Sequence, residues 1–369
     1  MPPITSTIVS VNAVVTTAPA PSGLQQSGTL VSVGGTTLAT NASQYCGTLA
    51  QLESITSVTG NYVEVTNMGT TFFAQSSASD SPIGVSVLEL GLQTTALGAI
   101  NALDAWADAN PDVFYAYLVP ATWDTSNSTD VNSMASNFSS PTGKTYFFVT
   151  TTQAHLSNYA AANKAIVATV PSPTAAGTEF QAAALFYQFL VNDPGIANPA
   201  APMAFRYLFG VTPWVLTNNQ TAINAILSGF GNIVLSGAEG GVSTATLRNG
   251  TTIDGNQMMF WYAVDWILIQ AKLQLANNII NGSNENPPLY YNQNGINRLL
   301  AVLDDMGNSG ISFGLLLSAV FSATSFKDYT TANPSDYAAG IYKGFKCVAT
   351  PQLGFLSITF YLNATQFVP

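Results

Sequence analysis

The feature that most constrains the fold is an alternation of strand-like and helix-like segments between about residues 30 and 200. Three apolar runs read as buried strands: "VFYAYLV" (113–119), "KTYFFVTT" (144–151) and "KAIVATV" (164–170). Helical patterns lie around and between them, at residues 92–111, 129–138 and 179–195. Strands that alternate with helices are typical of layered α/β domains. We therefore predict an α/β domain with a largely parallel sheet.

The last third of the chain has a different pattern. Asn249-Gly250 lies between two alternating runs, which predicts a β-hairpin with its turn at this dipeptide. A long helix is predicted over residues 257–280 and a second over 292–307, closed by Gly307. The strand-like run "GFKCVAT" (344–350) follows. Helices together with antiparallel strands indicate an α+β domain, so the predicted fold class is mixed α/β and α+β.

Both ends of the chain alternate with a period of two residues, as half-buried β-strands do. At the C-terminal end the apolar positions are Leu356, Ile358, Phe360 and Leu362. At the N-terminal end they include Val9, Val11 and Val15, and a proline-rich break at residues 18–23 separates them from the rest of the chain. An apolar strand without a partner exposes unpaired backbone groups. We therefore expect extended N- and C-terminal β-arms that pair with another sheet.

The composition indicates a covered surface. The chain is 47% hydrophobic and only 8% charged, about a third of the charged share of an ordinary soluble domain. Residues 1–143 contain nine acidic residues and no Lys or Arg, which argues against nucleic-acid binding. The best apolar run, residues 258–269, is twelve residues long and contains Asp265, whereas a membrane span needs about 20. We expect no membrane insertion.

Motifs for catalysis are not evident. A single histidine, His155, is too few for most zinc or nucleophilic sites. Residues 143–145 imitate the end of a phosphate-binding loop, but Phe138 stands where that loop needs its first glycine. The paired acids read as solvated helix positions, and the two cysteines read as buried free thiols; these residues are Asp104, Asp108, Asp304, Asp305, Cys46 and Cys347. We predict no enzyme activity and no catalytic, cofactor or metal site.

Three long segments of the last third carry a resemblance to a known family. They are "GNQMMFWYAVDWILIQAKLQLANNI" (255–279), residues 286–311 and residues 333–362. In order and character they resemble the C-terminal domain of contractile-tail sheath proteins of bacteriophages. The opening "STIVSVNAVV" (6–15) is similar to the N-terminal arm of that family. Together these segments cover about 150 residues.

The resemblance implies a structural protein that polymerises into a helical sheath and contracts to drive a tail tube through the host envelope. Its partners would be further copies of itself, in stacked hexameric rings joined by strand exchange, and the tail tube, baseplate and terminator proteins. It would lie in the virion tail, after assembly in the host cytoplasm, and need no cofactor. The implied division is an N-terminal arm (1–20), a variable outer α/β domain (21–200), a tube-facing core (201–354) and a C-terminal arm (355–369).

The resemblance also places a tube-facing helix at residues 333–344. Its candidate contacts are Asp336, Lys343 and Lys346, with Lys327 nearby. Residues 339–341 are Ala, Gly and Ile where related sheaths often carry arginines, so solvated lysines are the alternative interpretation. Two other functions stay open: a non-contractile lattice protein of a surface layer or capsid, and, less favoured, an α/β enzyme.

Overall fold

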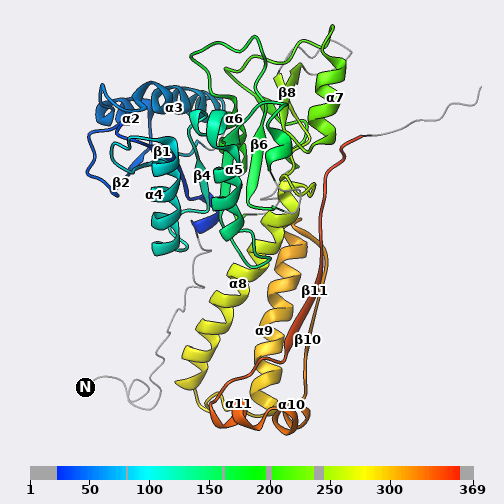
Figure 1. Ribbon diagram of the computed structural model, residues 1–369. Coiled ribbons are helices and arrows are strands. Elements are labelled where there is room, and N and C mark those ends of the chain that lie inside the picture. The colour runs from blue at the N-terminus through cyan, green and yellow to red at the C-terminus, as the bar shows by residue number, and fades with distance from the viewer. Residues whose placement is uncertain (1–22, 80–81, 160–162, 197–201, 237–244, 358–369) are drawn as a thin grey trace, which may run out of the picture.

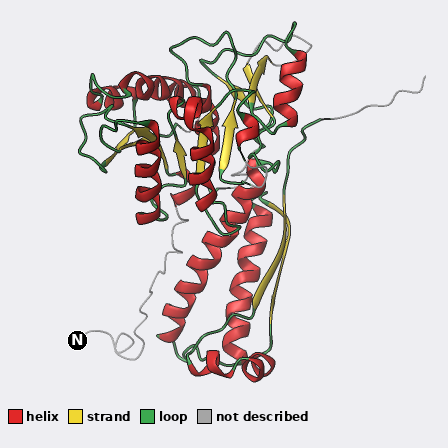
Figure 2. Cartoon of the chain, viewed as in Figure 1, coloured by secondary structure: helices red, strands yellow, loops and turns green. Residues whose placement is uncertain are grey.

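The computed structural model describes residues 23–79, 82–159, 163–196, 202–236 and 245–357. Figure 1 shows a broad upper part, built from the described residues between 23 and 256, which we call the head. A narrow lower part, residues 258–351, extends from it, and we call this part the stalk. The head holds most of the strands, and two long helices form the stalk (Figure 2).

A six-stranded sheet forms the centre of the head. Its strand order is β2-β3-β1-β4-β5-β6, and all neighbours pair in parallel except β2, which is antiparallel to β3. The strands are β1 (Gly28–Ser32), β2 (Ser43–Cys46), β3 (Val85–Glu89), β4 (Ala116–Leu118), β5 (Tyr146–Thr150) and β6 (Ile166–Thr169). The predicted layered α/β domain with a largely parallel sheet is confirmed.

Helices cover both faces of this sheet, because successive strand residues point to opposite sides. In β1, Leu30 faces the cluster formed with α3 and α6, whereas Val31 faces the cluster formed with α4 and α5. Strands that are buried on both faces read as continuous apolar runs, which is the pattern seen in the sequence. The helices of the head are α2 (Leu49–Ile55), α3 (Tyr62–Ser77), α4 (Ala96–Ala109), α5 (Thr122–Asn137), α6 (Gln181–Leu190) and α7 (Gln220–Ser228), with short 3-10 turns η1 (Gly23–Gln26) and η2 (Leu156–Asn158).

A small antiparallel sheet of order β7-β9-β8 completes the head. It comprises β7 (Tyr207–Leu208), β8 (Ile233–Ser236) and β9 (Ala245–Arg248). The hairpin predicted at Asn249-Gly250 is wrong, because these residues follow β9 and lie outside the β8–β9 connection. Both have positive φ angles, 71° and 68°, so the turn chemistry is real. It directs the chain from β9 toward the long helix of the stalk.

The stalk consists of two long helices and a two-stranded sheet. Its elements are α8 (Met258–Ser283), α9 (Gln293–Ser312), β10 (Leu316–Ala323), α10 (Phe326–Ala332), α11 (Pro334–Ala338) and β11 (Phe345–Pro351). The predicted end of the second helix at Gly307 is wrong, because α9 continues to Ser312. Gly307 instead lets a strand approach, since a Cβ there would lie 2.8 Å from the Phe321 ring. Strands β10 and β11 run beside α9, and α10 and α11 lie at the far end (Figure 1).

Head and stalk share one continuous apolar core. Tyr262 and Trp266 of α8 are buried in the same cluster as Phe186 and Phe189 of α6. Hydrogen bonds also connect the stalk helix to the head. The Trp266 Nε1 donates to the carbonyl of Pro194 over 3.2 Å. The Tyr262 hydroxyl donates to the carbonyl of Asn192 over 3.0 Å. The first turns of α8 therefore belong structurally to the head.

Candidate inter-subunit surface

One face of the stalk sheet packs on α9, and the other face is exposed to solvent. β10 and β11 pair antiparallel from Leu316 opposite Pro351 to Ala323 opposite Phe345. Leu316 and Phe321 are buried toward α9, and a Cβ at Gly310 would lie 2.8 Å from Leu316 Cδ1. The small residues of α9 thus allow close contact with the sheet. This packing fixes the hairpin along the helix.

The outward face of this sheet is apolar at its centre. Val320 and Val348 lie directly opposite each other and are 63% and 73% exposed. Leu317, three positions before Val320 at a register irregularity of β10, is 63% exposed. The sheet has two strands among the described residues, so both outer edges present backbone N–H and C=O groups without a strand partner there. Open edges beside exposed valines are a template for adding another strand.

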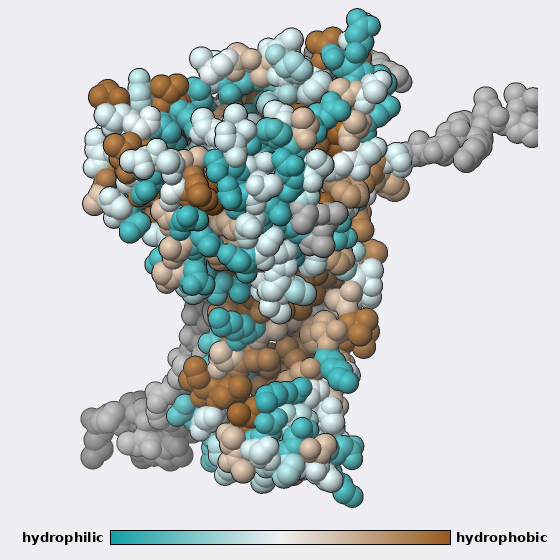
Figure 3. Space-filling view, in the orientation of Figure 1, coloured by the Kyte–Doolittle hydropathy of each residue, from teal (hydrophilic) through white to brown (hydrophobic). Residues whose placement is uncertain are grey.

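Helix α8 also exposes apolar side chains beyond the head. Ile279 and Ile280 are 48% and 62% exposed, and Leu273 and Leu275 are half-buried. Brown, hydrophobic residues lie across the middle of the stalk in Figure 3, above its mainly teal and white lower end. A helix that is apolar around most of its circumference is normally covered. In the described chain α9 covers only part of α8. The remaining apolar surface is the kind that the composition predicts to be covered by another molecule.

The far end of the stalk is organised by aromatic side chains. Tyr291 contacts Phe326, Tyr337 and Tyr342 with ring centroids 5.3–6.1 Å apart. The Tyr329 hydroxyl donates to Asp336 Oδ2 over 2.7 Å and accepts from the Lys343 backbone N–H over 2.9 Å. These contacts hold α10, α11 and the loop before β11 together as one unit, which we call the tip.

The tip brings two of the four residues predicted to face a tube, Asp336 and Lys343, into contact. Lys343 Nζ lies 3.2 Å from Asp336 Oδ1, and this contact together with the Tyr329 hydrogen bond lowers the pKa of the Asp336 carboxyl. Lys327 on α10 and Lys346 on β11 are exposed. The predicted helix over residues 333–344 is wrong beyond Ala338, because Gly340 has a φ of +72° and the chain turns there.

Most residues predicted for the two arms lie outside the described part of the chain: Val9, Val11, Val15, Ile358, Phe360 and Leu362. Leu356 is described, is 43% exposed and is not in a strand. Sequence reasoning missed strand β10, although Leu, Val and Phe in its run "LLSAVFSA" could have suggested a strand. Cys347 is exposed in β11, so the prediction that it is buried is wrong; Cys46 is buried.

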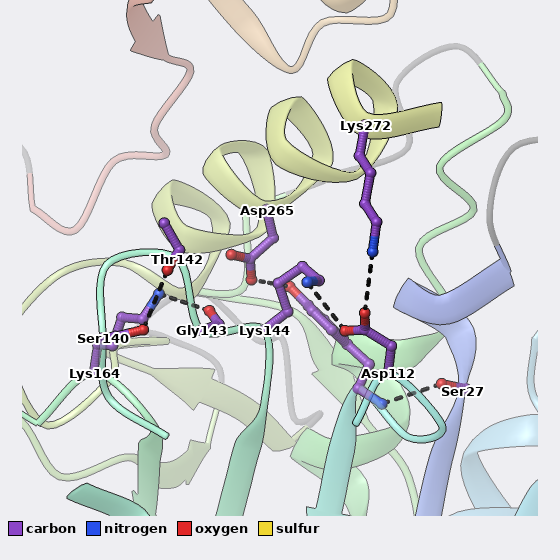
Figure 4. Close-up of polar contacts among 10 residues, drawn as sticks. Ser27, Asp112, Ser140, Thr142, Gly143, Lys144, Lys164, Asp265 and Lys272 are labelled. Atoms are coloured by element: carbon purple, nitrogen blue, oxygen red, sulfur yellow. Dashed lines mark hydrogen bonds and ion pairs between the residues drawn. The ribbon is translucent and has the colours of Figure 1, made fainter. Parts of the chain in front are cut away.

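A buried polar cluster lies where α8 meets the head (Figure 4). Asp265 of α8 is fully buried, and its Oδ2 accepts from the hydroxyls of Tyr115 and Tyr146 over 2.9 and 2.7 Å. Its Oδ1 is buried without a hydrogen-bond partner. Nearby, Lys164 Nζ donates to the carbonyl of Gly143 over 2.8 Å and lies 4.3 Å from the Trp261 ring centroid.

Burial governs protonation in this cluster. Desolvation raises the pKa of the Asp265 carboxyl to about 6, although the Lys164 charge and the two tyrosine hydroxyls act in the opposite direction. Burial also lowers the pKa of the Lys164 ammonium. Around the cluster, Asp112 lies 3.0 Å from Lys144 Nζ and 3.8 Å from Lys272 Nζ of α8. The arrangement fixes the stalk helix to the N-terminal ends of β4 and β5 and raises the pKa of Asp265.

The single histidine and a buried aspartate of the head are hydrogen-bonded within the subunit. His155 Nδ1 lies 2.8 Å from Asp124 Oδ2, and Asp124 Oδ1 accepts from Thr151 and Tyr159, both over 2.7 Å. Among the described residues, no group of three or more His, Cys, Asp or Glu side chains is arranged to hold a metal ion. No described helix combines the length and hydrophobicity that a membrane crossing needs.

Solved structures with a similar fold come from contractile particles. A chain in the baseplate of the anti-feeding prophage aligns with a TM-score of 0.62 at 12% identity, over 97% of this chain and 99% of that chain. A chain of the contracted helical sheath of the same prophage aligns at 0.56 and 11%, over 97% and 99%. The sheath tail protein of Listeria innocua aligns at 0.57 and 9%, over 83% and 90%. No protein-family model and no curated protein sequence matches the chain.

These matches show that the chain has the fold of contractile-tail sheath proteins over nearly its whole length. The sequence resemblance covered the last third and the opening segment, and the structure extends the likeness to the α/β head. The mixed α/β and α+β fold class is confirmed.

Proposed function

We propose that this protein is a structural subunit of a contractile tail and polymerises into a helical sheath. The observation that carries the proposal is the β10–β11 sheet, which has two open edges and an apolar outward face within a sheath fold. Copies of the chain would join when the alternating segments at residues 6–15 and 356–365 add strands to this sheet in neighbouring subunits. The division at residues 20, 200 and 354 stays a prediction.

Strand addition suits this sheet for physical reasons. Strand β10 is eight residues long and β11 is seven. The alternating segment near the C-terminal end is ten residues long, so it could pair along the full length of either strand. A strand of about ten residues spans roughly 33 Å, enough to reach an adjacent subunit. The side chains at alternate positions would pack on Val320 and Val348 and set the register. The donated strand and the acceptor sheet are different surfaces on different copies, so their contact is heterologous. A heterologous contact that does not close into a ring continues as a helix.

The tip is the proposed contact with a tail tube protein. Lys343 forms an ion pair with Asp336 within the subunit. Of the candidate tube contacts, Lys327 and Lys346 are therefore the cations that remain for a partner protein. Exposed Tyr290 and Tyr337, at 62% and 49%, surround the same end of the stalk. We therefore propose a tube contact in which aromatic packing matters more than charge. As part of the same proposal, the sheath contracts, binds baseplate and terminator proteins, and lies in the tail of the virion.

The first experiment compares the full-length chain with a version that ends at Gly354, each with and without the tube protein, by negative-stain electron microscopy. The proposal expects tubes or ring stacks from the full-length chain and their loss on truncation. Polymers that survive truncation would exclude donation by the C-terminal strand. Single particles from the full-length chain, with tube protein present, would contradict the sheath function. Flat lattices would favour the surface-layer or capsid alternative.

A pair of point variants tests the acceptor surface. Val348→Asp places a charge at the centre of the outward face, where the residue is 73% exposed. It should leave the free subunit folded and abolish polymerisation, because an added strand would bury that charge. Val58→Asp is the matched control, since Val58 is 85% exposed in a head loop. Equal assembly of both variants and the unmodified chain would refute the assignment of β10–β11.

A further inference from the structure

Gly354, close to the end of the described chain, is hydrogen-bonded by one side chain. Gln257 Nε2 donates to the carbonyl of Gly354 over 2.9 Å, and the Gly354 N–H donates to Gln257 Oε1 over 3.0 Å. A side-chain amide thus makes both hydrogen bonds that an antiparallel partner strand would make to one residue. Residues 257 and 354 are 97 positions apart, so this contact ties the end of the stalk sheet to the start of α8.

Gln257 is itself fixed by the backbone around it. It forms an antiparallel bridge with Thr251, and the next residue, Met258, donates its N–H to the carbonyl of Gly250 over 3.0 Å. Its φ of −63° and ψ of 140° place it at the N-cap position of α8, at the joint between head and stalk. The side chain therefore starts from a rigid point, so little freedom remains to be lost when it binds the Gly354 peptide group.

Gly354 fits this place because it has no side chain. A Cβ there would lie 2.3 Å from Pro202 Cβ. The hairpin ladder ends just before it, where the Gln352 N–H donates to the carbonyl of Leu315 over 2.9 Å. Directly after it, Phe355 and Leu356 are 76% and 43% exposed. Leu353 before it is also 52% exposed, so Gly354 is a single held position between exposed residues, just before the alternating C-terminal pattern begins.

We propose that Gln257 is a positioning residue for the C-terminal segment. By holding Gly354 against Pro202, it sets the point and direction at which residues 355 onward leave the subunit. A donor strand that starts from a fixed point reaches a neighbouring sheet with less loss of entropy than one on a loose tether. The inference rests on the proposed function, since it concerns the strand that the sheath subunit would donate.

The first test uses the free, full-length subunit and does not depend on assembly. Hydrogen–deuterium exchange of the peptide that contains Gly354 is compared among the unmodified chain, Gln257→Ala and Gly354→Ala. The amide at position 354 should exchange about tenfold faster or more in Gln257→Ala, because its hydrogen bond is lost. Gln51→Ala is the matched control, since Gln51 Oε1 accepts from the Gly47 N–H over 2.7 Å in the head. Unchanged exchange in Gln257→Ala overturns the inference.

The second test measures the rate of polymerisation at a temperature well below the unfolding midpoint of every variant. Gln257→Ala and Gly354→Ala should assemble at least about tenfold more slowly than the unmodified chain. Gly177→Ala is the control for added bulk, because a Cβ there has no neighbour within 4 Å. Faster exchange with an unchanged assembly rate would overturn the positioning role. If the unmodified chain never assembles, the sheath function fails, whereas the exchange result still decides whether Gln257 holds the segment.

Discussion

The buried carboxyl of Asp265 should make folding stability depend on pH in an unusual direction. Its pKa rises from 3.8 to about 6 on folding. Because the folded chain holds this proton more tightly than the unfolded chain does, the stabilisation is fully present below pH 4. It is lost as the pH rises through about 6. A shift of about two pKa units corresponds to about 3 kcal/mol.

The assay is urea unfolding from pH 4 to pH 7.5 for the unmodified chain and for Asp265→Asn, which cannot ionise. The free energy of unfolding of Asp265→Asn relative to the unmodified chain should increase by about 3 kcal/mol across this range. Tyr146→Phe removes the 2.7 Å hydrogen bond to Oδ2 and should move the transition to higher pH. A difference between the first two curves that does not change with pH would refute the reasoning.

Three further outcomes follow from contacts of the described chain. Gly307→Ala places a Cβ 2.8 Å from the Phe321 ring and should cost about 1–3 kcal/mol in urea unfolding; an unchanged midpoint would mean that the ring moves aside freely. Glu89→Gln replaces a buried carboxylate whose Oε2 accepts from Ser32 and Thr36 and whose Oε1 accepts from two backbone amides. This variant should lower the free energy of unfolding by about 2 kcal/mol, measured by thermal unfolding. An unchanged unfolding midpoint would mean that the hydrogen bonds to the Glu89 carboxylate do not stabilise the fold. Lys343→Ala should leave the unfolding midpoint of the free subunit nearly unchanged, because the Lys343 side chain is 67% exposed and solvent screens its ion pair.

Three strands of the head are predicted correctly from the sequence because their burial is nearly complete. Residues 113–119, 144–151 and 164–170 contain β4, β5 and β6, because strands covered on both faces must be apolar throughout. The errors arise where a residue has a tertiary purpose. Gly307 reads as a helix end and is instead a contact surface for Phe321. Asn249-Gly250 reads as a hairpin turn and instead leads the chain into α8.

The sequence by itself determined the fold class and the expectation of a covered surface, because periodicity and charge content are local quantities that any packing must respect. It also determined that the chain has alternating segments in need of a sheet. Only the tertiary structure decided where an open-edged sheet lies among the described residues, since β10 and β11 pair with each other and β10 packs on α9. The same holds for Asp265, which interrupts an apolar run in the sequence. Burial raises its pKa, in a site lined by tyrosines that lie 150 and 119 positions away in the sequence.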